Sequence, residues 1–152
     1  MALEYFKKGI DKGDFNSLTS IGHLYEDGDL GQKDYKKALE YYLLGADACV
    51  PKCCYYAGEF YYYGHGTKPD YQKAYQYFKK GSQLSDSSSM NFLACLYEEG
   101  KGIQKDKNMA FMLYKEAAKD EENAQAFKRW KSCFFIGVKN PLPLIIIMVV
   151  TD

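Results

Sequence analysis

The chain of 152 residues has no excess charge of either sign, because 20 lysines and arginines are matched by 20 aspartates and glutamates. A nucleic-acid-binding protein would present a strongly basic face, so this balance argues against nucleic acid as a partner. Histidine is scarce as well. Only His23 and His65 occur, and neither has a recurring carboxylate partner in the sequence. We therefore expect no nucleophile–base pair and no enzyme activity.

Long hydrophobic runs are also missing. The stretch Leu142–Val150 has nine residues including one proline, whereas a bilayer span needs about 20 apolar residues. Extending it back to Phe134 brings in a lysine, an asparagine and another proline. We therefore predict that residues 134–152 form an apolar tail outside the fold and not a membrane anchor. A membrane anchor stays open as the alternative. At the other end, the residues from Ala2 to Lys8 are amphipathic, unlike a signal peptide.

Cysteine is limited to five residues, and because five is odd at least one thiol stays unpaired within the chain. Cys49, Cys53 and Cys54 are close enough in sequence to suggest metal ligands, but neither histidine stands at a zinc-finger spacing from them. We expect buried free thiols, a reducing and therefore cytoplasmic environment, no metal and no cofactor.

The sequence does have an internal repeat, and its period is 36 residues without a gap. The recurring residues are Ala2, Ala38, Ala74 and Ala110; Asp34, Asp70 and Asp106; Tyr25, Tyr61 and Tyr97; and Gly28, Gly64 and Gly100. Such regularity indicates one structural unit repeated along the chain.

Each unit contains two predicted helices, of which the second is the easier to recognise. Ala74, Tyr77, Phe78 and Gly81 follow the spacing i, i+3, i+4, i+7, which places them on one face of a helix. Asp70 precedes this face, where a carboxylate accepts hydrogen bonds from the free backbone N–H groups of the first turn. We call this the B helix.

The first helix of the unit carries small residues and a tyrosine on one stripe. We number the full copies one, two and three, at residues 17–46, 52–81 and 88–118. In copy two these residues are Cys53, Ala57, Gly58 and Tyr61. Small side chains allow a neighbouring helix to approach closely, and residues 64–70, rich in glycine and ending in Pro-Asp, turn the chain. We call this the A helix. Each unit is therefore a helical hairpin that must stack on its neighbours to bury both faces.

The sequence thus predicts an all-α, right-handed solenoid of stacked hairpins with no strand. Residues 1–133 would hold half a repeat, three full copies and a decayed fourth. The predicted helices cover residues 2–9, 17–27, 35–46, 52–63, 71–81, 88–99, 107–118 and 122–134. We expect a monomer or a part of a larger array.

The repeated motif resembles the Sel-1-like repeat, a relative of the tetratricopeptide repeats. Copy two shows it as Ala57-Gly58-Glu59-Phe60-Tyr61, then Gly64-His65-Gly66, then Asp70, Lys73-Ala74 and Tyr77-Phe78. The resemblance covers about residues 2–125. Copy four departs from it, since Trp130 stands at the Gly58 position. The first helix has no A helix before it, so we expect a piece of a longer array or an array with decayed ends.

The resemblance implies a non-catalytic protein-interaction scaffold or adaptor that binds a peptide or protein segment on its concave face. Because some relatives act in endoplasmic-reticulum quality control, association with that compartment is an alternative location. Two other functions stay open. Cysteine-rich bacterial members have been linked to penicillin binding or β-lactamase activity, but Cys53 and Cys95 do not recur at 36 residues. The chain could also be a structural spacer.

Partner-binding residues are predicted from the aromatic surplus of copy two. The family's A helices are expected to line the concave side, and residues that vary there on a fixed frame are candidates for recognition. Tyrosine offers a large contact area with few rotatable bonds. The candidate residues are Tyr55, Tyr56, Glu59, Tyr62, Tyr63 and, from copy three, Phe92. The alternative is that some of these rings only pack against neighbouring helices.

Overall fold

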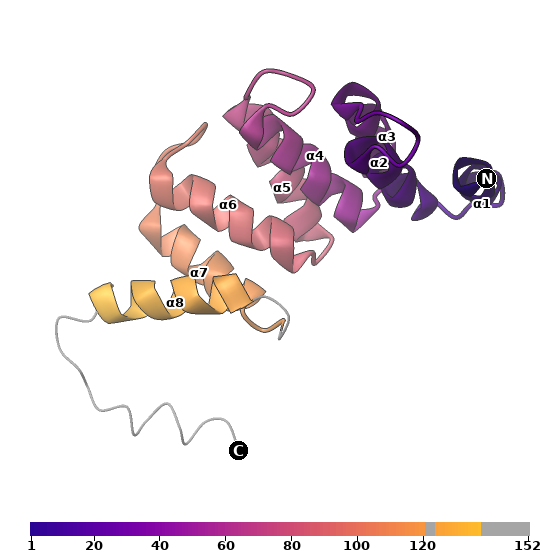
Figure 1. Cartoon of the computed structure of the whole chain (residues 1–152). Helices are drawn as coiled ribbons and strands as arrows, with labels where there is room; N and C mark the ends of the chain where they lie inside the picture. Colours follow the sequence, from indigo (N-terminus) through magenta and orange to yellow (C-terminus); the bar gives the residue numbers. More distant parts are fainter. Residues whose placement is uncertain (121–123, 138–152) are drawn as a thin grey trace, which may run out of the picture.

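The computed structural model describes residues 1–120 and 124–137, and this part of the chain is helical without strands (Figure 1). Its helices are α1 (Ala2–Asp11), α2 (Ser17–Asp27), α3 (Tyr35–Asp47), α4 (Pro51–Tyr63), α5 (Tyr71–Gln83), α6 (Ser87–Glu99), α7 (Lys107–Ala117) and α8 (Ala124–Gly137). The predicted solenoid of helical hairpins is confirmed. The A helices are α2, α4 and α6, and the B helices are α3, α5 and α7.

The helix ends follow from local chemistry. The backbone N–H of Lys37 donates to Asp34 at 3.0 Å, that of Lys73 donates to Asp70 at 3.0 Å, and that of Met109 donates to Asp106 at 3.0 Å. Each B helix therefore has the predicted aspartate cap. A glycine with a left-handed backbone conformation follows each A helix. Residues other than glycine rarely adopt this conformation.

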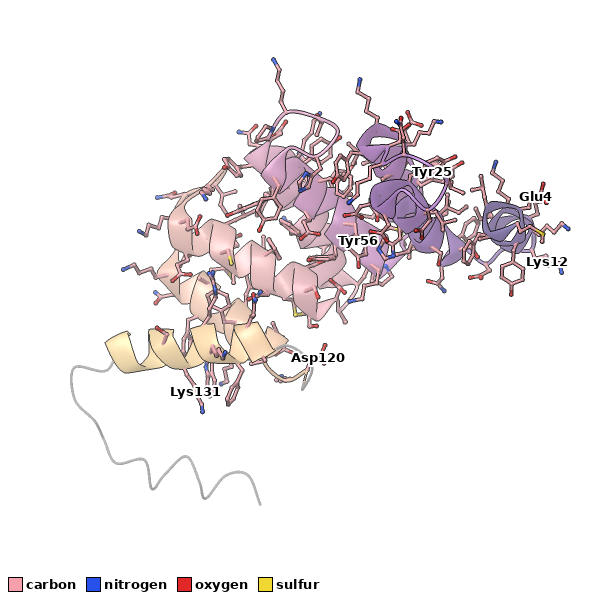
Figure 2. All side chains as sticks on the ribbon, viewed as in Figure 1. Glu4, Lys12, Tyr25, Tyr56, Asp120 and Lys131 are labelled. Atoms are coloured by element: carbon pink, nitrogen blue, oxygen red, sulfur yellow. The ribbon has the colours of Figure 1, made fainter. Side chains whose placement is uncertain are left out.

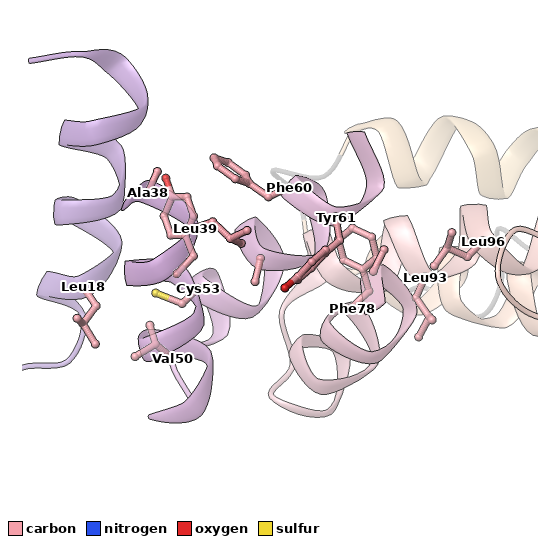
Figure 3. Close-up of a cluster of buried hydrophobic side chains, with 13 residues drawn as sticks. Leu18, Ala38, Leu39, Val50, Cys53, Phe60, Tyr61, Phe78, Leu93 and Leu96 are labelled. Carbon is pink, nitrogen blue, oxygen red and sulfur yellow. The ribbon is translucent and has the colours of Figure 1, made fainter. Parts of the chain in front are cut away.

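The core lies both between the A and B helices of one copy and between neighbouring copies. Ala57, Phe60 and Phe78 are fully buried in it, and Tyr61 is nearly so (Figure 3). The Phe60 ring packs on the Tyr42 ring of α3, in the preceding copy, at 5.2 Å. The rings of Tyr61 and Tyr77 stack with centroids 5.7 Å apart. The helices come this close because Gly58 has no side chain: a Cβ at that position would lie 2.6 Å from the Phe78 ring.

The array curves toward its A helices. Helix α2 contacts α4, and α4 contacts α6, whereas no comparable contact joins α3 to α5 or α5 to α7, all of which lie within described residues. Figure 1 shows α4 and α6 side by side with α5 partly behind them. We call the side formed by α2, α4 and α6 the inner face.

The first helix, α1, has no buried residue, and the Tyr5 side chain is 74% exposed. Phe6 is half-buried, whereas its repeat equivalent in copy one, Tyr42, is fully buried. At the other end, α8 continues past the predicted array boundary at residue 133, and the predicted tail from residue 138 onward lies outside the described residues. Within the described residues, no helix is both long and apolar enough to cross a bilayer.

Candidate functional site

The structure brings the six predicted partner-binding residues together. Five of them project from α4, and Phe92 projects from α6. The ring centroid of Phe92 lies 5.7 Å from Tyr55, 5.7 Å from Tyr62 and 6.4 Å from Tyr63. Tyr55 donates a hydrogen bond of 3.1 Å to Glu59. These residues form one aromatic cluster that spans two copies.

The members of the cluster lie at different depths. Tyr63 is the most open of the six, with 53% of its surface exposed, whereas Tyr55, Tyr56, Glu59, Tyr62 and Phe92 are half-buried. Tyr56, labelled in Figure 2, stacks on the buried Tyr42 at 5.0 Å and contacts His23 of α2 at 4.7 Å. Tyr55 and Tyr56 therefore stabilise the packing between copies as well as lining the inner face.

Copy two is aromatic where the other copies are polar. In copy one the Tyr42 hydroxyl donates to Glu26 at 2.6 Å, and in copy three the Tyr114 hydroxyl donates to Glu98 at 2.7 Å. Copy two has Phe78 and Tyr62 at the equivalent positions. A buried tyrosine hydroxyl needs a hydrogen-bond partner, which the glutamate supplies in copies one and three. Phe78 has no hydroxyl, so copy two does not need a glutamate at the position of Tyr62.

Sequence reasoning missed a residue beside the cluster, Lys101 in the loop after α6. Its ammonium lies 5.2 Å from the Tyr62 ring and 5.4 Å from the Tyr71 ring, contacts Glu99 at 2.6 Å and donates to the Tyr62 hydroxyl at 3.2 Å. The repeat spacing could have identified Lys101, because His65 stands 36 residues earlier. The His65 ring stacks on Tyr35 at 5.3 Å, and Tyr35 is the repeat equivalent of Tyr71. The middle residue of the glycine loop thus contacts the preceding copy.

Glu59 is the charged member of the cluster. Burial raises the pKa of its carboxyl above the ordinary value, and the nearby carboxylate of Glu26 raises it further, while the hydrogen bond from Tyr55 and the charge of His65 lower it. Within the described residues, no lysine or arginine forms an ion pair with Glu59 or Glu26. The inner face therefore holds two carboxylates on adjacent A helices that no lysine or arginine of the described residues pairs with.

We predict that Glu59→Gln raises the melting temperature at pH 7. A carboxyl whose folded-state pKa is raised destabilises the folded state when it is ionised, and the penalty disappears as the pH falls through the folded pKa. The difference between variant and parent should therefore shrink by about pH 4, near the ordinary pKa of glutamate. Thermal melts of both chains at the two pH values test this. A variant that melts below the parent at pH 7 would contradict it.

Other chemistry finds little support among the described residues. They contain no group of histidine, cysteine and acidic side chains able to hold a metal ion. Cys53, Cys54 and Cys95 are buried free thiols, as predicted, whereas Cys49 is exposed. Burial raises the pKa of the Cys54 thiol to about 11 and raises those of Cys53 and Cys95 as well. At neutral pH these thiols are protonated and poorly nucleophilic.

Fold and surface together define an interaction solenoid of the tetratricopeptide type. The sequence profile of the Sel1 repeat matches residues 1–14, 17–48, 51–86 and 87–121. The chain belongs to the Sel1 repeat family, whose members are generally non-catalytic scaffolds for protein–protein interaction. No curated protein matches the chain.

Solved structures agree with this assignment. A Sel1 repeat protein from Oxalobacter formigenes is 31% identical with a TM-score of 0.81, and the match covers 93% of this chain and 57% of that one. The protective antigen c5321 of uropathogenic Escherichia coli, described as displaying an SLR fold, is 25% identical with a TM-score of 0.72, over 77% of this chain and 25% of that one. Helicobacter pylori cysteine rich protein B shares the fold at 23% identity, with a TM-score of 0.57 over 75% of this chain and 86% of that one.

Proposed function

We propose that this chain is a non-catalytic adaptor that holds a peptide or protein segment against its inner face. One observation carries the proposal: Tyr55, Tyr56, Glu59, Tyr62, Tyr63 and Phe92 form a continuous cluster on the A helices, and Tyr63 is largely open to solvent. Tyrosine-rich surfaces with a buried centre and an open rim are typical of binding hot spots. The free thiols support a reducing, cytoplasmic location.

Selection of peptides from a random library on the folded chain tests the proposal. Each recovered peptide is labelled with fluorescein, and its affinity is measured by fluorescence anisotropy. We predict that Tyr63→Ala weakens binding by about 2 kcal/mol, or about 30-fold in the dissociation constant, because the variant loses the most accessible ring of the cluster. Its melting temperature should change little, since Tyr63 is 53% exposed.

The matched control is Tyr5→Ala on α1, which removes a tyrosine that is 74% exposed and lies outside the inner face. It should leave peptide binding unchanged. Equal losses in the two variants would mean that tyrosine exposure alone, and not the cluster, attracts peptides. If the selection recovers no binding peptide, the chain behaves as a structural spacer and the proposal fails.

A further inference from the structure

The proposed adaptor function can be taken one step further, to the chemistry of the segment that binds. We propose that this segment is basic, and that one of its lysine or arginine side chains lies beside Tyr56, between the carboxylates of Glu26 and Glu59. The inference rests on the proposed function, because it specifies the occupant of the same inner face.

The charge distribution over the inner face is the first observation. The acidic residues of the A helices are Glu26 and Asp27 on α2, Glu59 on α4, and Glu98 and Glu99 on α6. On α6 these charges are compensated, since Lys101 pairs with Glu99 at 2.6 Å and Arg129 of α8 pairs with Glu98 at 3.4 Å. Among the described residues, none of the acidic side chains of α2 and α4 forms an ion pair. The negative charge is therefore concentrated on the first two A helices, although the whole chain is neutral.

Burial makes the charge on Glu59 costly. Glu26 and Glu59 are half-buried, and each accepts a hydrogen bond from a single tyrosine, Tyr42 at 2.6 Å and Tyr55 at 3.1 Å. The Glu26 carboxylate is close enough to raise the pKa of Glu59. Two half-buried carboxylates that have no lysine or arginine partner are stabilised by a cation placed between them.

Two basic side chains of the chain itself already lie beside a tyrosine ring and a carboxylate. Arg129 lies 5.8 Å from the Tyr114 ring, donates to its hydroxyl at 3.0 Å and pairs with Glu98. Lys101 lies over the Tyr62 and Tyr71 rings and pairs with Glu99. A tyrosine ring beside a carboxylate favours lysine and arginine through both the ring quadrupole and the opposite charge.

Copy one repeats this arrangement without a lysine or arginine from the described chain, and the His23 ring of α2 lies 5.9 Å from Tyr42 and 4.7 Å from Tyr56. Tyr42 and Glu26 are the repeat equivalents of Tyr114 and Glu98, which Arg129 joins. The ring of Tyr56, 5.0 Å from Tyr42, and the carboxylate of Glu59 complete the surroundings on the α4 side. A basic side chain from a bound segment would thus act in copy one as Arg129 acts in copy three.

The experiment uses a labelled peptide recovered in the selection described above, together with a neutral copy in which citrulline replaces each arginine and norleucine each lysine. We expect recovered peptides to be rich in arginine or lysine, and the neutral copy to bind at least about 10-fold more weakly, equivalent to one good charge-assisted contact. Glu59→Gln should weaken the basic peptide to a similar degree and leave the neutral copy unaffected. Glu40→Gln, which removes an exposed carboxylate from α3, is the matched control and should alter neither affinity.

The outcomes separate the two proposals. Peptides that lack basic residues yet lose affinity in Tyr63→Ala would overturn the basic segment and leave the adaptor function standing. The basic segment is overturned in the same way if Glu59→Gln weakens the basic peptide and its neutral copy equally. Recovery of no peptide overturns the adaptor function and this inference with it. Because Glu59→Gln is expected to raise the melting temperature, loss of binding in that variant cannot be ascribed to unfolding.

Discussion

Phe78→Ala should destabilise the chain by about 3–5 kcal/mol, the usual cost of truncating a buried phenylalanine. The Phe78 ring is fully buried and stacks on Phe92 of the next copy at 5.0 Å. Its loss would leave a cavity beneath the aromatic cluster, because Tyr55 also rests against it at 6.4 Å. Urea unfolding followed by circular dichroism measures the effect.

The control for this variant is Phe15→Ala. Phe15 is 45% exposed, in the turn between α1 and α2, so its truncation removes far less buried surface. The Phe78 variant should also bind selected peptides more weakly wherever it is still folded, since the cluster loses the ring that supports it. Similar losses of stability in the two variants would show that Phe78 does not hold the copies together.

Gly58→Leu is the second large effect, and we expect a loss of about 3 kcal/mol from overpacking. This loss comes despite the higher helix propensity of leucine. Even a Cβ at Gly58 would lie 2.6 Å from the Phe78 ring, so the rest of a leucine side chain has no space. Gly58→Ala should cost less, because copy three has Ala94 at this position, packed against Tyr114. Denaturant unfolding of both variants gives the comparison.

A double-variant cycle connects these two predictions. In the Phe78→Ala background the clashing ring is absent, so Gly58→Leu should destabilise much less than it does in the parent. Gln76→Leu, at an exposed position of α5, controls for adding leucine to a helix surface. If Gly58→Leu costs the same with and without Phe78, the close approach of α4 and α5 is not what selects glycine.

The fold could be predicted from the sequence because its determinants are local and recur. The aspartate caps, the terminal glycines and the spacing of small and aromatic residues each act within one or two turns. Helix ends at Asp27, Tyr63 and Glu99 agree with prediction, since a glycine follows each of them. Helix α5 runs to Gln83, beyond the predicted residue 81, because Gly81 does not adopt the left-handed conformation and the backbone N–H of Leu84 still donates to the carbonyl oxygen of Lys80 at 3.2 Å.

The candidate site could be predicted only in outline. Comparing copies identified the surplus tyrosines, but the distances between copies depend on how one hairpin is rotated against the next. Contacts such as Tyr56 on Tyr42 and Lys101 over Tyr71 join neighbouring copies and therefore depend on that rotation. The proximity of Glu26 to Glu59 has the same origin, since the two belong to different copies. A repeat therefore predicts its own hairpin better than the surface that two hairpins form together.

The packing of each helix against its neighbours in the chain also determines how the molecule can fold. The main contacts join helices that are consecutive, or successive A helices. Native contacts therefore form between segments close in sequence, and only short loops must close before those contacts stabilise the chain. The contact order is low, so the time needed to fold is set by one hairpin finding the next rather than by the length of the array.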